Sequence, residues 1–352
     1  MGSSSRVLGA VYVMSQRIKH IKQLHKPADR VARVIVRNIR KNMLKARRIW
    51  LNQAANPSGD QQDSEALHNF RVEIRRLRVW LQLTRDLIRT KTKARMQLKN
   101  WAQGSNAGRD LEVMLGLLQQ ANAEDNLDLP SNSLIEKDKD LIRLISEPAL
   151  ALKPRPRTSS CSRPRMQAQS TKCTPFSAWL ADRLHDEREK TLPLLREKDE
   201  TLHEARIHIK HMRYLIEPIA LSELKSTQSA LNQLKALQTT LGDLHDLFVL
   251  REKLPSLICG LLNERLTARL QQPSTLTDPL NGSQTDPKTG PSKRAIQQDF
   301  TAIRNQYTLY LGWQAKQYDH AIESWHTISE QASARLEMVL NDLIGELKNL
   351  SQ

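Results

Sequence analysis

The sequence predicts an all-α protein that contains a repeated helical unit. Apolar residues recur with the 3.6-residue period of helices along much of the chain, whereas the alternation typical of β-strands does not recur. Glycine is scarce, with 12 residues in 352, and runs of β-branched residues are short, so strands have little support. The third observation is a pattern of one histidine and several arginines that occurs twice in the chain.

The first predicted helices lie in the N-terminal third of the chain. Residues 1–27 are expected to be disordered or partly helical. A helix then begins at Pro27 with Asp29 in its first turn and continues through a basic stretch to Trp50. The polar segment NPSGDQQDS, residues 56–64, separates it from the next helix, which carries HNFRVEIRRLRVW at residues 68–80.

The remaining helices alternate with polar segments. A break is predicted near Gly104 to Gly108, followed by helices from Arg109 to about Gln120 and at 133–147. The Pro-, Ser- and Arg-rich residues 153–175 and the segment 271–293 have too little apolar content to bury a core and are predicted to be a linker and a disordered loop. The predicted organisation is a first helical bundle at 28–152, a second at 176–330 and a C-terminal amphipathic helix at 331–352.

The charge and cysteine content limit the class of partner and the compartment. The formal net charge is +16 and the sequence pI is 9.9, which indicates a polyanionic partner such as nucleic acid, inorganic polyphosphate or an anionic membrane surface. Three scattered cysteines are too few for a disulfide framework, and no run approaches the length of a membrane span. We therefore expect a cytoplasmic protein.

The segment HNFRVEIRRLRVW places cations and core residues on different faces of one helix. At about 100° per residue, its cationic side chains share an arc of roughly 80°, while Phe70, Ile74 and Leu77 share a second arc roughly 110° away. The cationic row of this helix is His68, Arg71, Arg75 and Arg78, with Arg76 close by in sequence. Such a row requires an anionic partner or extensive hydration.

The same pattern recurs at residues 203–214, HEARIHIKHMRY. The second row consists of His203, Arg206, Lys210 and Arg213, which align with His68, Arg71, Arg75 and Arg78 in that order. Downstream, GRDLEV with Asp110 aligns with LHDLFV with Asp246 at nearly the same spacing from the motif histidine. Two matches at one spacing indicate a duplicated helical unit.

Four motifs of the chain resemble those of the CHAD family, the conserved histidine α-helical domains. They are HxxRVxxRRLR, RDLEV, HxxRIxxKxxRY and LGxxxD. The resemblance covers about residues 28–325 apart from the loops. It implies two pseudo-symmetric four-helix bundles with a basic surface or channel between them, and binding of inorganic polyphosphate, often at polyphosphate granules. Some relatives carry a CYTH triphosphatase domain, whose ExExK signature is missing here, so a stand-alone CHAD protein is expected. His211 departs from the family pattern, because Arg or Lys is expected there.

The rows suit a phosphate chain on chemical grounds as well. Arg forks match phosphate oxygens, and successive members of a row are about 4.5 to 6 Å apart along the helix axis. The preceding helix offers a second set of cations on one face: Arg30, Arg33, Arg37 and Lys41. Asp110 and Asp246 are expected to hold the arginines through salt bridges or capping.

Other functions have less support from the sequence. His68 and His203 lack a metal-binding partner at i+4, and His208 with His211 is only a weak metal signal, so neither a metal nor a cofactor is predicted. The usual nucleotide-loop and hydrolase motifs are missing, which favours a protein that is not an enzyme. The alternatives left open are a nucleic-acid backbone binder and an accessory subunit of a phosphate-metabolising enzyme.

Overall fold

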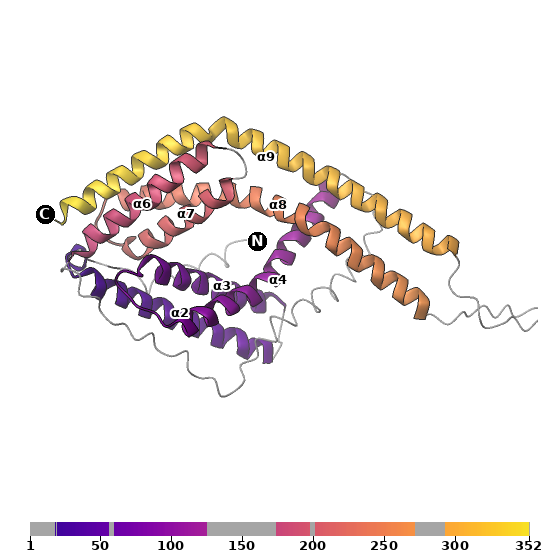
Figure 1. Cartoon of the computed structure of the whole chain (residues 1–352), viewed down its shortest axis with the longest axis horizontal. Helices are drawn as coiled ribbons and strands as arrows, with labels where there is room; N and C mark the ends of the chain where they lie inside the picture. Colours follow the sequence, from indigo (N-terminus) through magenta and orange to yellow (C-terminus); the bar gives the residue numbers. More distant parts are fainter. Residues whose placement is uncertain are drawn as a thin grey trace, which may run out of the picture. The chain divides into compact units, whose positions relative to one another are not determined.

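The structure is a computed structural model of the whole chain, and it describes residues 18, 20–55, 60–124, 174–197, 201–271 and 293–351. Within these ranges every regular element is a helix, which confirms the predicted all-α class (Figure 1). The elements are η2 (Ile21–Gln23), α2 (Ala28–Ala55), α3 (Asp60–Leu83), α4 (Thr92–Glu124), α6 (Phe176–Arg196), α7 (Leu202–Ile216), η4 (Glu217–Ile219), α8 (Ser226–Gln271) and α9 (Lys293–Asn349). Of these helices, none combines the length and apolar character of a membrane span.

The chain divides into two compact units that do not follow the order of the sequence. The first unit comprises Met1–Leu111, Lys137–Asp243 and Ser324–Gln352, and the second comprises Glu112–Glu136 and Leu244–Glu323. Each unit therefore draws on both predicted halves. Nearly all of the two predicted linkers, and the helix predicted at 133–147, lie outside the described residues.

The first unit contains two helix pairs, α2 with α3 and α6 with α7 (Figure 1). The apolar arc predicted for α3 is buried, with Phe70, Ile74 and Leu77 each no more than 2% exposed. The two pairs are joined by contacts between α2 and α6 and between α3 and α7. One such contact is polar, because the indole Nε1 of Trp80 donates a hydrogen bond to the Tyr214 carbonyl oxygen at 3.0 Å.

The starts of α2 and α6 are linked by a reciprocal pair of backbone hydrogen bonds. The amide of Ala28 donates to the carbonyl of Thr174, and the amide of Phe176 donates to the carbonyl of Lys26, both at 2.9 Å. Pro27 and Pro175 stand opposite each other in an antiparallel bridge. A two-fold relation between the repeats would give this pattern, although the duplication itself stays a prediction from the sequence.

The second unit consists of the C-terminal part of α4, most of α8 and the first part of α9. The carboxylate oxygen Oε2 of Glu124 accepts hydrogen bonds from Trp313 Nε1 and Gln317 Nε2, each at 3.0 Å. The amide Nε2 of Gln314 donates to the Leu247 carbonyl at 3.2 Å. Trp313 is 3% exposed, so aromatic burial and side-chain hydrogen bonds together connect these three helices.

Two helix boundaries differ from the prediction. The break expected near Gly104 to Gly108 is wrong, because α4 continues from Thr92 to Glu124. A glycine inside a helix costs only about 1 kcal/mol relative to alanine, which burial of flanking residues such as Ala102 and Met114 can offset. The C-terminal helix predicted at 331–352 is the last part of the 57-residue helix α9.

Candidate polyanion-binding site

The cationic row of α3 is only partly accessible to a ligand. His68 and Arg78 are exposed and Arg75 is half-buried, as the helical face predicted. Arg71 differs, since it is only 5% exposed. The row therefore offers His68, Arg75 and Arg78 to an approaching anion, while Arg71 is packed within the first unit.

Arg76 holds helices together in this structure. Its guanidinium contacts two carboxylates, Oε1 of Glu73 at 2.7 Å through Nη1 and Oε2 of Glu217 at 2.9 Å through Nε. Burial disfavours the charged form of Arg76, but the attraction of Glu217 and Glu73 outweighs it and raises the pKa. The sequence placed Arg76 among the phosphate-binding residues because of its neighbours. Its 7% exposure and two partners indicate an internal ion pair instead.

Glu217 joins the two motif helices. Besides Arg76 of α3, it contacts Arg213 of α7, with 3.3 Å between Arg213 Nε and Glu217 Oε1. The guanidinium carbons of Arg76 and Arg213 lie 5.8 and 5.0 Å from the ring centre of Tyr214. The C-terminal ends of the two rows are thus fixed relative to each other through one carboxylate and one aromatic ring.

The row of α7 creates a locally cationic environment. His203 is exposed, and Arg206, Lys210 and Arg213 are half-buried. Partial burial lowers the pKa of His203, and the positive charges of Arg206 and Lys210 lower it further. A phosphate chain placed here would neutralise those charges and reverse their effect on the histidine.

Arg206 is positioned by the helix that follows. A side-chain carbon added at Gly242 of α8 would lie 3.7 Å from Arg206 Nη2, so the guanidinium rests over this glycine. Burial raises the pKa of the adjacent Asp243 carboxyl, and the charge of Arg206 opposes that rise. The Arg206 side chain therefore lies beside Gly242 of the Leu241–Gly242 pair, at a distance that is ordinary van der Waals contact.

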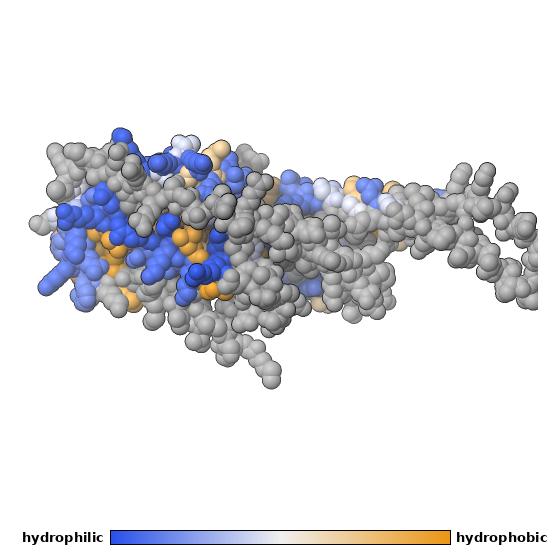
Figure 2. Space-filling view, turned by 90° about the horizontal axis from the view of Figure 1, so that it is seen from below, coloured by the Kyte–Doolittle hydropathy of each residue, from blue (hydrophilic) through white to orange (hydrophobic). Residues whose placement is uncertain are grey.

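The second set of predicted cations lies on α2. Arg30, Arg37 and Lys41 are exposed, and Arg33 forms a salt bridge of 3.1 Å with Asp29. Seen from below, hydrophilic side chains cover much of the coloured surface near α2 and α3, with apolar patches between them (Figure 2). Three of the four predicted α2 cations are thus exposed, and within the described residues only Arg33 of the four has a carboxylate partner.

A pocket between α3 and α4 adds cations that the motif did not contain. It has a volume of about 310 Å³, and its cationic lining residues are Arg78, Arg85, Arg95 and Lys99. Only Arg78 belongs to the predicted row. The i, i+4 spacing of Arg95 and Lys99 on α4 is a usable signal in the sequence, but it lies outside the repeated motif. The α3 row therefore leads into a cationic pocket.

The predicted supporting carboxylates cannot both be placed. The side chain of Asp110 lies outside the described side chains, and Asp246 is half-buried on α8. Their role as salt-bridge or capping partners stays a prediction. A different group could hold a metal ion, namely Glu187 of α6 with His208 and His211 of α7.

Fold and site together define a class of protein: an all-helical chain that gathers cations along the faces of paired helices. Residues 43–255 match the CHAD domain family, and the chain belongs to this family. The fold is similar to the crystal structure of the CHAD domain from the plant Ricinus communis, with a TM-score of 0.54 and 19% identity, over 86% of this chain and 93% of that one. No functionally curated protein shows a significant match to the sequence.

Proposed function

We propose that this CHAD protein binds inorganic polyphosphate through the exposed cations of α2, α3 and α7, without altering it chemically. The observation that carries the proposal is the continuity between the α3 row and the pocket. Arg78 is both the last member of the row and part of the pocket lining, so a chain lying along α3 would reach three further cations there.

The spacing of the cations fits a repeating anion. His68, Arg75 and Arg78 stand at i, i+7 and i+10 of α3, about 10.5 and 4.5 Å apart along the axis from a rise of about 1.5 Å per residue. A phosphate chain carries roughly one charge per unit and offers oxygens on every unit, so His68, Arg75 and Arg78 can each contact a different unit. The guanidinium of an arginine can donate two parallel hydrogen bonds to such oxygens.

The pocket composition favours binding over phosphoryl transfer. Enzymes that transfer phosphoryl groups hold Mg²⁺ with carboxylates beside the phosphates. The described lining of this pocket contains four cations, together with Leu81, Gln82, Thr92, Met96 and Leu98, and no acid. We accordingly propose a binding or scaffolding role, in cells at polyphosphate granules as the family resemblance implies.

Charge reversal on the accessible part of the row tests the proposal. We expect Arg75→Glu combined with Arg78→Glu to lower polyphosphate affinity by at least about a hundredfold, because two charge-assisted contacts of about 1.5–3 kcal/mol each become repulsive. The matched control combines Arg335→Glu with Lys348→Glu, which reverses two exposed cations of α9 and so changes the net charge by the same amount. Equal losses in the two variants would show that only net charge matters, and the proposed site would be wrong.

A further inference from the structure

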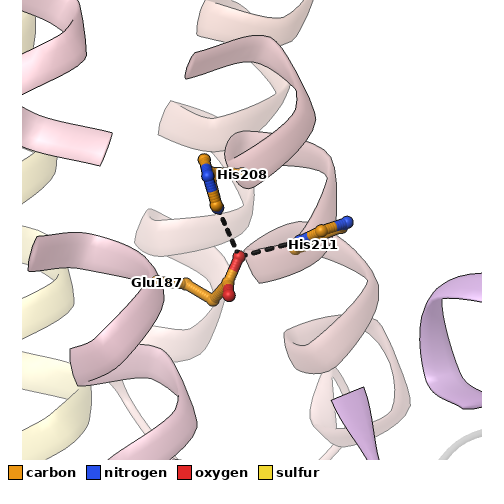
Figure 3. Close-up of side chains that lie close together, drawn as sticks. All are labelled: Glu187, His208 and His211. Carbon is orange, nitrogen blue, oxygen red and sulfur yellow. Dashed lines mark hydrogen bonds and ion pairs between the residues drawn. The ribbon is translucent and has the colours of Figure 1, made fainter. Parts of the chain in front are cut away.

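Glu187, His208 and His211 converge on one point between α6 and α7 (Figure 3). The Nδ1 atoms of both histidines lie 2.8 Å from the same carboxylate oxygen, Oε2 of Glu187. One potential ligand atom from each residue lies within 4.8 Å of the others. On α7 the two histidines occupy a different face from the phosphate row, so this group is separate from the proposed polyphosphate site.

The carboxylate at the centre of this group is buried and ionised. Glu187 is 4% exposed. Burial by itself disfavours its charge, yet the hydrogen bonds and attraction of His208 and His211 lower its pKa to about 2. Lys190 Nζ lies 3.6 Å from the other oxygen, Oε1, on a side chain that is 57% exposed. A buried negative charge of this kind is stabilised by a cation at Oε2.

We propose that Glu187, His208 and His211 bind a divalent transition-metal ion, with Zn²⁺ as the probe, and that the ion connects α6 to α7. Two imidazole nitrogens and one carboxylate oxygen are a ligand set that zinc accepts, with a fourth position left for water. At metal–ligand distances of about 2.0–2.2 Å, tetrahedral ligands are about 3.4 Å apart. The 2.8 Å between each Nδ1 and Oε2 is shorter than this by about 0.6 Å, so metal binding requires each imidazole to rotate slightly away from the carboxylate oxygen.

The surroundings of His208 match those of a metal-binding histidine. Its second ring nitrogen, Nε2, lies 3.8 Å from Oε1 of Glu204, one turn earlier on α7. Metal-bound histidines commonly donate the remaining N–H to a carboxylate, which fixes the ring and its tautomer. The Glu204 side chain is 65% exposed, so it can move the short distance needed for a direct hydrogen bond.

Among the described side chains, the second predicted repeat offers this group and the first does not. By the alignment of the two motifs, His208 and His211 correspond to Glu73 and Arg76 of the first repeat. There a guanidinium pairs with the carboxylate at 2.7 Å, and a guanidinium does not bind metal ions. His211, which replaces the Arg or Lys expected from the family pattern, is therefore the substitution that creates the site.

Calorimetric titration of the full chain, without a histidine tag and without polyphosphate, tests this inference. We expect one Zn²⁺ per chain, and we expect Co²⁺ to give the visible absorption of a four-coordinate site. Mg²⁺ should not compete, because it prefers an all-oxygen octahedron. Failure of the wild-type protein to bind one Zn²⁺ tightly enough to be measured would overturn the proposal.

Three variants locate the ion. His211→Arg keeps a positive partner for Glu187, so the protein should fold and lose both zinc binding and the cobalt spectrum. Glu204→Gln should lower the affinity for zinc by about tenfold, because a metal-bound histidine loses the carboxylate that accepts its second N–H. His320→Gln, which removes an exposed histidine of α9, should bind like wild type. Zinc binding that is unchanged in His211→Arg would place the ion elsewhere and refute the site, whatever the state of the polyphosphate proposal.

Discussion

Arg76 and Arg78 are two residues apart on α3, and we predict opposite consequences when each is replaced by methionine. Arg76 is 7% exposed and contacts Glu73 and Glu217, whereas Arg78 is exposed and lines the cationic pocket. Methionine retains much of the apolar length of arginine and removes the charge. The pair therefore separates a cation that maintains the fold from a cation that is available to bind a ligand.

The magnitude follows from what each side chain contacts. Removing one partner of a buried ion pair costs about 3–5 kcal/mol, because the other charge loses its compensation. Glu73 is 2% exposed, so its charge would stay buried after its partner is removed. The Glu217 side chain is 19% exposed and also contacts Arg213, so its charge would remain partly compensated. We therefore expect Arg76→Met to lower the free energy of unfolding by about 3 kcal/mol, the lower end of that range.

For Arg78→Met we expect a change in the free energy of unfolding within about 0.5 kcal/mol, as for other exposed positions. Its polyphosphate affinity should fall by about 10- to 150-fold, which corresponds to one lost charged hydrogen bond of about 1.5–3 kcal/mol.

The assay has two parts: urea unfolding followed by circular dichroism, and polyphosphate titration under conditions where every variant is folded. Arg76→Met should keep an affinity close to wild type. A double variant that also carries Glu73→Gln should recover part of the lost stability, because the buried charge is removed with its partner. If Arg76→Met is as stable as wild type and binds polyphosphate poorly, Arg76 is a ligand residue and the roles assigned here are reversed.

Three further predictions concern other parts of the first unit. Titration of His203 by NMR should show a pKa that rises when polyphosphate is added, because the ligand neutralises Arg206 and Lys210; an unchanged pKa would contradict binding at α7. Replacing Arg95 and Lys99 together by glutamate should weaken polyphosphate binding and leave the midpoint of urea unfolding nearly unchanged. If this variant binds polyphosphate as tightly as wild type, the pocket is not part of the binding site. The stability advantage of wild type over Glu187→Gln should be fully present above pH 4.5 and be lost as the pH falls towards about 2, because folding lowers the pKa of this carboxyl; a difference that persists at pH 2 would show that charge is not its cause.

Helical periodicity was sufficient to predict the main elements. The apolar arc of α3, with Phe70, Ile74 and Leu77, is buried as the spacing indicated. The uninterrupted α4 was not predictable from local preferences, since Gly104 and Gly108 argue for a break that the rest of the helix outweighs. Local sequence gives the cost of a residue in a helix, but the compensating burial depends on contacts that are distant in sequence.

The candidate site was predicted less completely, for the same reason. The helical spacing assigned Arg71 to the cationic face, yet Arg71 is buried in the folded protein and is only 5% exposed. Arg76 finds its second carboxylate at Glu217, 141 positions away. Likewise, His208 and His211 gave only a weak metal signal in the sequence, because the third member of the group, Glu187, comes from another helix. Contacts within one helix were visible in the sequence, and contacts between helices were not.

Competition for the cationic surface tests the central claim most directly. Labelled long-chain polyphosphate is bound at about 150 mM salt, where weak surface attraction is largely screened, and is displaced by unlabelled polyphosphate, single- and double-stranded nucleic acid, or ATP. We predict that unlabelled polyphosphate displaces the label at concentrations about a hundredfold or more below those of nucleic acid. Equal competition by nucleic acid, with all binding lost as salt rises, would show a generic basic surface and contradict selective binding of polyphosphate.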